Sequence, residues 1–264
     1  MIGIYAWNAG ATGMQVAADL VAMICGAAVV DLSGVCNKAA SSSAGVASGW
    51  SVVDSAYGVI GAASQDGGPA RQARIMASDA PRVLLAGVHE WDLVGHVPGA
   101  ATNALECSAV VSDAGAVNVV ATAAGILLAA SDWSLWAMVA EAKRGAPGLP
   151  AGYPGAVVVN GFGYGYVPKA KNPEALGWVE NAAAAVVSSY AGLSAKPARD
   201  GVDTLYVPMV PACVAVKQVP FGELLGVRAV GGYGQSGDTM TDAAADVWQI
   251  ARISTGLALA MVRE

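Results

Sequence analysis

The stretch Met1-Ile-Gly-Ile-Tyr-Ala-Trp-Asn-Ala-Gly10, continued by Ala-Thr-Gly13 and an apolar run to Asp31, carries the strongest fold signal in the chain. Residues 2–7 read as a strand, 8–13 as a glycine loop, 14–25 as a helix and 27–31 as a second strand. Such a loop directs backbone N–H groups and the positive end of a helix dipole toward one point. The order therefore predicts an α/β fold with an anion-binding loop.

The composition favours elements that are buried on more than one face. Of the 264 residues, 55% are hydrophobic and 13% are charged. Parallel sheets have this character, because helices cover both of their faces. One α/β domain accommodates a chain of this length, so we expect a single domain over residues 1–264.

Apolar runs alternate with helix-like segments along the chain. The predicted strands are 2–7, 27–30, 82–86, 109–112, 133–139, 156–159 and 204–207. The predicted helices are 14–25, 50–60, 69–76, 117–130, 173–191 and 241–262. This alternation is typical of parallel strands joined by right-handed crossovers. We therefore predict three layers, with a mainly parallel sheet of about seven strands and helices on both faces, as in P-loop nucleotidases.

Three polar residues follow predicted strands and are candidates for a site. Asp31 follows Val29-Val30, Asp113 follows Val110-Val-Ser112, and Asn160 follows Val157-Val-Val159. Ligands of open parallel sheets bind at the carboxyl ends of the strands. Each residue alone is also a common turn initiator. Together, beside a glycine loop, they favour a nucleotide pocket.

This order of motifs resembles the ParA/MinD branch of P-loop nucleotidases, whose Walker A loop is deviant. The segment Leu205-Tyr-Val-Pro208 is similar to the strand-plus-proline segment that closes around the base in that family. The resemblance implies a homodimer that binds ATP and Mg²⁺ and positions or partitions DNA or another cargo. The resemblance also allows a regulatory pseudo-ATPase, with a protein partner.

The resemblance assigns roles to individual residues. Asp31 would be the catalytic aspartate that activates water, and Asp113 would hold the metal through water. Asn160 and Pro208 would contact the base. The nucleotide loop would comprise Gly10, Ala11, Thr12, Gly13, Met14 and Gln15.

Two positions in this loop depart from the family. Met14 stands where a lysine neutralises phosphate charge, and Gln15 stands where a hydroxyl holds magnesium. Phosphoryl transfer depends on such charges. We therefore expect weak or absent ATP hydrolysis, while the loop N–H groups still favour binding.

Two alternatives from other classes stay open. The loop Gly10-Ala-Thr-Gly13 also resembles the first turn of Rossmann NAD(P)-dependent oxidoreductases, although Val16 stands where a third glycine is expected. The other alternative is a non-catalytic scaffold on the same fold. Its contacts would be exposed aromatic side chains, with Trp50, Trp91, Trp133, Trp136 and Trp178 as candidates.

Charge and length limit the remaining partners. A net charge of −6 and a pI near 4.9 predict that DNA binding is weak. The apolar run 117–130 is shorter than the roughly 20 residues of a spanning helix, so we expect no membrane span. No secretory signal is evident, and we expect a cytoplasmic protein with free thiols.

One further cluster contains residue types found in metal and acid–base sites. His89-Glu-Trp-Asp92 and the nearby His96 lie after a predicted strand. Their spacing has no regular ligand pattern. We therefore interpret this segment as a surface loop.

Overall fold

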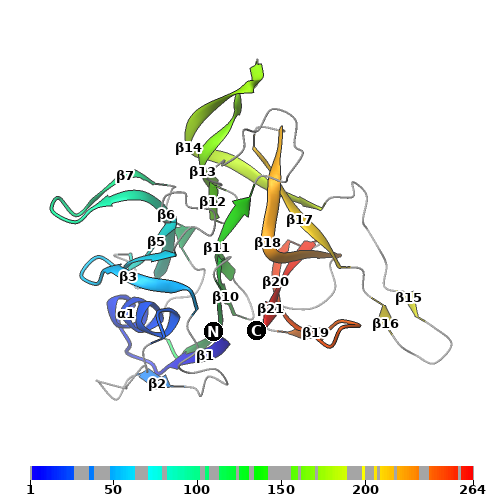
Figure 1. Cartoon of the computed structure of the whole chain (residues 1–264). Coiled ribbons are helices and arrows are strands. Elements are labelled where there is room, and N and C mark those ends of the chain that lie inside the picture. Colours follow the sequence, from blue (N-terminus) through cyan, green and yellow to red (C-terminus); the bar gives the residue numbers. More distant parts are fainter. Residues whose placement is uncertain are drawn as a thin grey trace.

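The computed structural model describes residues 2–26, 36–38, 48–62, 71–78, 82–101, 105–106, 113–122, 125–130, 134–141, 156–159, 162–169, 172–188, 198–199, 205–206, 209–216, 219–231, 238–254 and 257–263. In this part of the chain the fold is antiparallel β with one α-helix (Figure 1). Every strand pairing found there is antiparallel. The predicted three-layer parallel sheet of the P-loop type is therefore wrong, and the ParA/MinD likeness loses its structural basis.

The larger sheet has 13 described strands, in the order β19-β20-β21-β18-β17-β14-β13-β12-β11-β10-β9-β1-β2. Most sequence neighbours in it are also neighbours in space, as expected for hairpins. Its strands are β1 (Ile2–Trp7), β2 (Cys36–Lys38), β9 (Gly115–Thr122), β10 (Gly125–Ala129), β11 (Ser134–Glu141), β12 (Ala156–Val159), β13 (Phe162–Lys169), β14 (Asn172–Ser188), β17 (Met209–Val216), β18 (Val219–Gly231), β19 (Thr239–Thr241), β20 (Val247–Ser254) and β21 (Leu257–Arg263).

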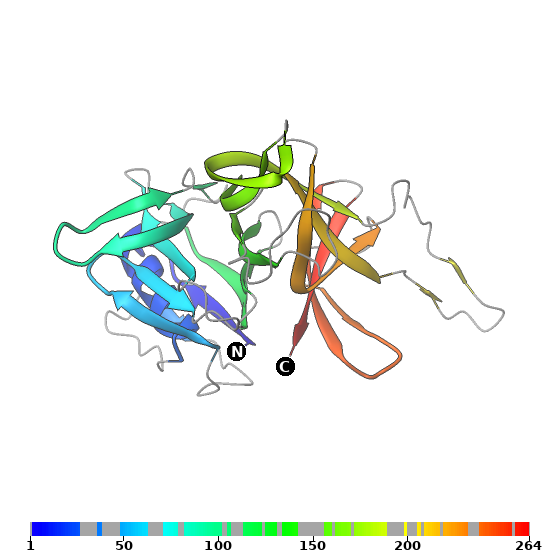
Figure 2. The ribbon, with the colours of Figure 1, turned by 45° about the horizontal axis from the view of Figure 1, so that its top comes forward.

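A smaller sheet forms the other side of the N-terminal half, separate from the C-terminal strands (Figure 2). Its order is β3 (Trp50–Asp54), β4 (Val59–Ala62), β5 (Arg71–Ala77), β6 (Val83–Asp92) and β7 (Val97–Ala101). β8 (Leu105–Glu106) also pairs with β6. A separate two-stranded sheet joins β15 (Ala198–Arg199) to β16 (Leu205–Tyr206).

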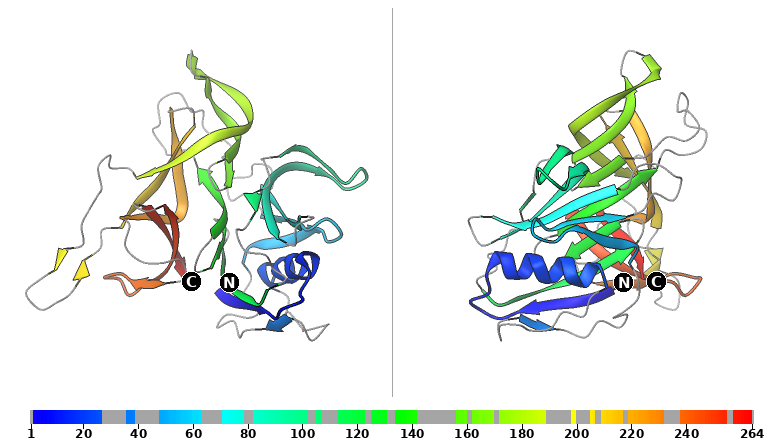
Figure 3. Two further views of the ribbon diagram at one scale, coloured as in Figure 1. Left: turned by 180° about the vertical axis from the view of Figure 1, so that it is seen from behind. Right: turned by 60° about the vertical axis from the view of Figure 1, so that its left-hand side comes forward.

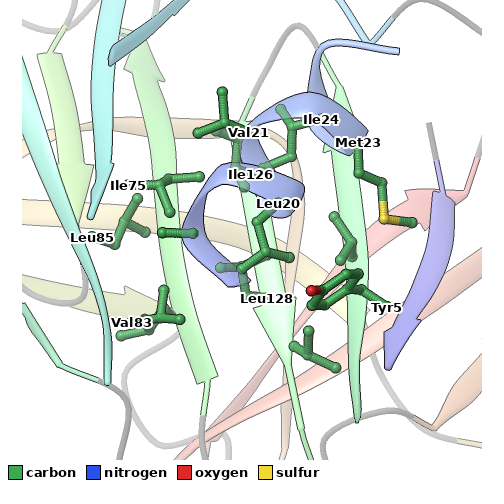
Figure 4. Close-up of a cluster of buried hydrophobic side chains, with 14 of the residues drawn as sticks. Tyr5, Leu20, Val21, Met23, Ile24, Ile75, Val83, Leu85, Ile126 and Leu128 are labelled. Atoms are coloured by element: carbon green, nitrogen blue, oxygen red, sulfur yellow. The ribbon is translucent and has the colours of Figure 1, made fainter. Parts of the chain in front are cut away.

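The helix α1 (Gly13–Ile24) lies between the two sheets in the N-terminal half (Figure 3). Its apolar side chains are buried in one cluster with residues of both sheets (Figure 4). β5 and β6 contribute Ile75, Val83 and Leu85, and β1 and β10 contribute Tyr5, Ile126 and Leu128. From the helix come Leu20, Val21, Met23 and Ile24. One buried helix therefore connects the cores of the two sheets.

The described residues between 117 and 130 are mostly buried, as expected, but they form the paired strands β9 and β10 and not a helix. Thr122 pairs with Gly125, and Asn118 pairs with Ala129. The Asn118 amide donates to the Ala129 carbonyl across the pair, at 3.2 Å. β-Branched valines in β9 favour an extended backbone, and this preference outweighs the alanines nearby.

The other long predicted helices are also strands. Residues 241–262 contain β20 and β21, in which Arg252 pairs with Ala258. Residues 173–191 fall largely in β14, residues 50–60 contain β3 and the start of β4, and residues 69–76 overlap β5. Alanine favours helices only weakly, by a few tenths of a kcal/mol over most residues, so pairing with neighbouring strands overrides that preference.

Candidate functional site

The predicted strand–loop–helix start is present, because β1 ends at Trp7 and α1 begins at Gly13. Gly10 adopts φ +93°, a conformation that favours glycine. Ala11 is buried and donates its N–H to the Asn8 carbonyl at 3.3 Å. The predicted order of strand, glycine loop and helix is therefore present as local structure, although the strands around it are antiparallel.

The start of the helix is closed by its own side chains. Thr12 is the N-cap, and its hydroxyl accepts the Gln15 N–H at 3.2 Å. The Gln15 side chain accepts the Thr12 N–H at 2.9 Å. This reciprocal pair is a capping box, which satisfies backbone donors at a helix start. Gln15 thus has a structural role here, and the neighbouring Met14 side chain is 77% exposed.

Asp113 lies beside the end of β1, close to the loop. β1 and β9 are antiparallel with Trp7 opposite Gly115, so the last residue of β1 meets the first residue of β9. The Trp7 indole donates to the Asp113 carbonyl at 2.6 Å, and the Asp113 side chain is exposed. The glycine loop after β1 and the segment that contains Asp113 therefore lie close together, because β1 and β9 pair antiparallel.

The remaining predicted nucleotide residues, Asp31, Asn160 and Pro208, fall outside the described ranges. Within those ranges, no group of three or more His, Cys, Asp or Glu side chains is placed to hold a metal ion. The predicted binding of ATP and Mg²⁺ assumed a parallel sheet, and it stays a prediction. No helix in the described part is long and apolar enough to cross a membrane.

A different cluster of polar and aromatic side chains lies where two hairpins end. Both turns have the sequence Asp-x-x-x-x-Val, as Asp54-Ser-Ala-Tyr-Gly-Val59 and Asp92-Leu-Val-Gly-His-Val97. Asp pairs with Val in each hairpin. In each, the Asp carboxylate accepts the N–H two residues on, at 3.2 Å from Ala56 and 2.8 Å from Val94.

The fourth residue of each turn adopts a left-handed conformation. Gly58 has φ +67° and His96 has φ +53°. Gly58 is required by space as well, because a Cβ there would lie 2.0 Å from the Ile75 carbonyl oxygen. Histidine is one of the few side-chain-bearing residues enriched in this region. The turn geometry therefore fixes where the His96 side chain begins.

Asp54 joins the two hairpins through one carboxylate. Its Oδ2 accepts the Trp91 indole N–H at 3.0 Å and lies 2.7 Å from His96 Nδ1. The Asp54 side chain is 7% exposed, whereas that of His96 is 41% exposed. These hydrogen bonds, with that from His96 foremost, hold the pKa of Asp54 below its ordinary value. Since the carboxylate only accepts, His96 Nδ1 donates and Nε2 is left for other contacts.

Aromatic rings and a guanidinium complete the cluster. The Tyr57 and His96 rings stack with centroids 4.5 Å apart and an angle of 16°. The Arg74 guanidinium lies 5.7 Å from the Tyr57 ring centroid and 5.4 Å from that of Trp91, within cation–π range. Its Nε also donates to the Tyr57 carbonyl at 2.9 Å. The two turns are thus held together by several independent contacts.

β6 must bend for this cluster to form. Arg74 pairs with Ala86, yet it also lies under the ring of Trp91, five residues further along β6. The Trp91 N–H donates to the Gln72 side chain at 3.0 Å. The end of the β6–β7 hairpin therefore folds back over β5 and reaches the β3–β4 turn.

Exposed apolar side chains surround the joined turns. Val94 is 91% exposed, and Leu93, Val97 and Tyr57 are also exposed. We call Tyr57, Leu93, Val94, His96 and Val97 the hairpin-tip surface. Among the described residues, large exposed hydrophobic side chains otherwise occur only at Ile4, Met14 and Val52. The hairpin-tip surface is thus the principal exposed apolar cluster in the described part of the chain.

A second turn uses a similar arrangement in the large sheet. Asp242 Oδ2 accepts the Trp248 indole N–H at 3.0 Å, and Arg228 lies 5.7 Å from the Trp248 ring centroid. The indole and two backbone N–H groups hold the pKa of Asp242 below its ordinary value. The exposed residues of this turn are alanines and Asp246. The Asp–Trp–Arg arrangement therefore stabilises turns in both sheets. The exposed aliphatic side chains belong to the hairpin-tip surface and are not found at the turn of Asp242.

Sequence reasoning interpreted residues 89–96 only as a surface loop and did not connect them to Asp54. The pattern Asp-x-x-x-x-Val, which occurs at residues 54–59 and 92–97, could have indicated that the two segments form equivalent hairpin turns. Two of the tryptophans predicted as exposed contacts, Trp50 and Trp91, are buried. The Trp50 indole donates to the Thr122 carbonyl at 2.7 Å.

No model of a known protein family matches the chain, and no curated protein matches it in sequence. The functional conclusion therefore rests on the geometry of the hairpins.

Proposed function

We propose that this protein is a non-catalytic interaction protein that contacts another protein through its hairpin-tip surface. The observation that carries the proposal is that exposed aliphatic side chains of one turn lie beside Tyr57 of a second turn, with both turns held by Asp54. A contact surface that is ordered before binding loses less conformational entropy on association. Contiguous exposed apolar surface commonly marks a site of interaction.

The Asp54–His96 pair also has the hydrogen-bond pattern of a general acid–base pair. Its surroundings favour a contact surface over an active site. Leu93, Val94 and Val97 beside His96 are each more than half exposed, so a small substrate would remain in water there. Small-molecule sites usually bury most of the ligand.

A photoreactive side chain tests the proposal. Benzoylphenylalanine replaces Val94, and the protein is irradiated in an extract of its native cells. The control carries the same group at Ala18, an exposed position on α1. We expect a discrete protein adduct from position 94 that position 18 does not form. Equal adducts at both positions, or none, would overturn the proposal.

A further inference from the structure

The end of the β6–β7 hairpin extends beyond the small sheet as a two-stranded arm. Val88 pairs with Gln72 of β5, but the residues of β6 that follow it, from His89 to Asp92, pair among the described strands only with β7. We call residues 89–100 the β6–β7 arm, which projects from the N-terminal half on the side away from the C-terminal strands (Figure 1). An isolated two-stranded hairpin is only marginally stable in water. The position of the arm therefore depends on its contacts with the β3–β4 turn and with β5.

The arm contributes few apolar side chains to the interior. Trp91 is buried with Val53, Val59 and Val88 in a cluster separate from the main one, which α1 shares with both sheets. Residues 92–99 of the arm are exposed. Segments that bury little apolar surface open at a lower free-energy cost than the packed core does. The arm therefore separates from the sheet more easily than the sheets separate from α1.

One oxygen atom makes both side-chain hydrogen bonds between the arm and β3. Asp54 Oδ2 accepts the Trp91 indole N–H at 3.0 Å and lies 2.7 Å from His96 Nδ1. The Trp91 backbone N–H donates to the Gln72 side chain on β5 at 3.0 Å. The ring contacts of Tyr57 join the arm to the β3–β4 turn in the same region. These contacts all cross one boundary, so they are lost together when the arm moves.

We propose that the β6–β7 arm is a conformational device, which undocks from the β3–β4 turn as a unit while both sheets stay folded. Undocking separates His96 from Tyr57, so the hairpin-tip surface is complete only when the arm is docked. A partner that binds the complete surface shifts the equilibrium toward the docked state. The undocking itself is a property of the free protein and goes beyond the proposed function.

Hydrogen exchange of two indole N–H groups, followed by NMR on the full chain, tests the proposal. Trp50 and Trp91 are both buried, and their indoles donate to the Thr122 carbonyl and to Asp54, respectively. Trp50 belongs to the main cluster and is therefore the matched control. We expect the Trp91 indole to exchange at least about a hundredfold faster than the Trp50 indole. Low urea should speed up exchange at Trp50 far more than at Trp91, because undocking exposes little surface.

Two variants separate the arm from the core. Leu20→Ala weakens the main cluster and should speed up exchange at Trp50 about a hundredfold, with Trp91 unchanged. Asp54→Asn weakens the contact that docks the arm and should speed up exchange at Trp91 about tenfold.

Two results would each overturn the inference. One is equal exchange rates and equal urea dependences for the two wild-type indoles, because the arm would then leave only when the protein unfolds. The other is an equal effect of Leu20→Ala on both indoles. Either result would leave the proposed function standing, because the adduct at position 94 tests that function separately.

Discussion

Asp54 is an acceptor shared by two hairpins, so its ionisation controls how they are held. Its folded pKa lies below the ordinary value of 3.8. The unfolded chain therefore takes up the proton at higher pH than the folded chain does. It follows that the stability from this carboxylate is complete above the unfolded value and is lost as the pH falls through the folded value.

A urea titration of Asp54→Asn checks this dependence. We expect the variant to unfold at a lower urea concentration than the wild type at about pH 6. The difference should shrink toward about pH 2.5, because the protonated carboxyl of the wild type, like the amide of the variant, no longer offers a charged acceptor to Trp91 and His96. Asp246→Asn, at an exposed carboxyl, serves as the control. A difference that stays constant across the titration would assign the effect to something other than ionisation.

Gly58 is the residue at which space and backbone conformation both exclude a side chain. Gly58→Ala should destabilise the protein by about 3 kcal/mol, which combines a left-handed alanine with a clash against the Ile75 backbone. Gly10→Ala is the matched control, since Gly10 also has positive φ but nothing lies within 4 Å of the added carbon. It should cost about 1 kcal/mol. Chemical denaturation measures both, and equal costs would show that the contact with Ile75 is unimportant.

At the scale of elements, the loop before α1 separates two interpretations of the same residues. Under the nucleotide interpretation, Met14→Lys with Gln15→Thr restores charge and a hydroxyl and should raise ATP affinity. The structure leads to another expectation, because Gln15 completes the capping box with Thr12. The double variant should gain no ATP affinity and lose about 0.5 kcal/mol of stability.

Isothermal titration with Mg-ATP and thermal unfolding of the same samples measure the two effects. Met14→Lys alone is the control and should leave stability unchanged, because Met14 is largely exposed. A clear rise in ATP affinity in a folded double variant would restore the nucleotide interpretation of this loop.

For the whole molecule, α1 links the cores of the two sheets through Leu20, which is fully buried. Leu20→Ala should cost about 3 kcal/mol, as expected for a cavity in a packed core. Hydrogen exchange should quicken both in β9 and β10 and in β5 and β6, because the helix contacts both sheets. Met14→Ala, on the same helix but exposed, should change neither. Faster exchange confined to one sheet would show that the sheets unfold independently.

Local signals in the sequence predicted what short segments do. The strand at residues 2–7, the glycine loop with Gly10, and the helix that follows are all present. The strand at 156–159 matches β12, and most of the described residues between 117 and 130 are buried, as the apolar run predicts. These features depend on a few neighbouring residues, such as a glycine with positive φ or a threonine that caps a helix. Composition and local pattern contain that information.

Local patterns in the chain are therefore enough to fix a set of apolar segments and one helix start. Whether the alanine-rich stretches in β14, β20 and β21 extend as strands depends on the rest of the fold, because the hydrogen bonds that favour this conformation come from distant partners. The same holds for the candidate site. Asp54 and His96 are 42 residues apart, and they meet because β6 bends back over β5, which no local pattern specifies.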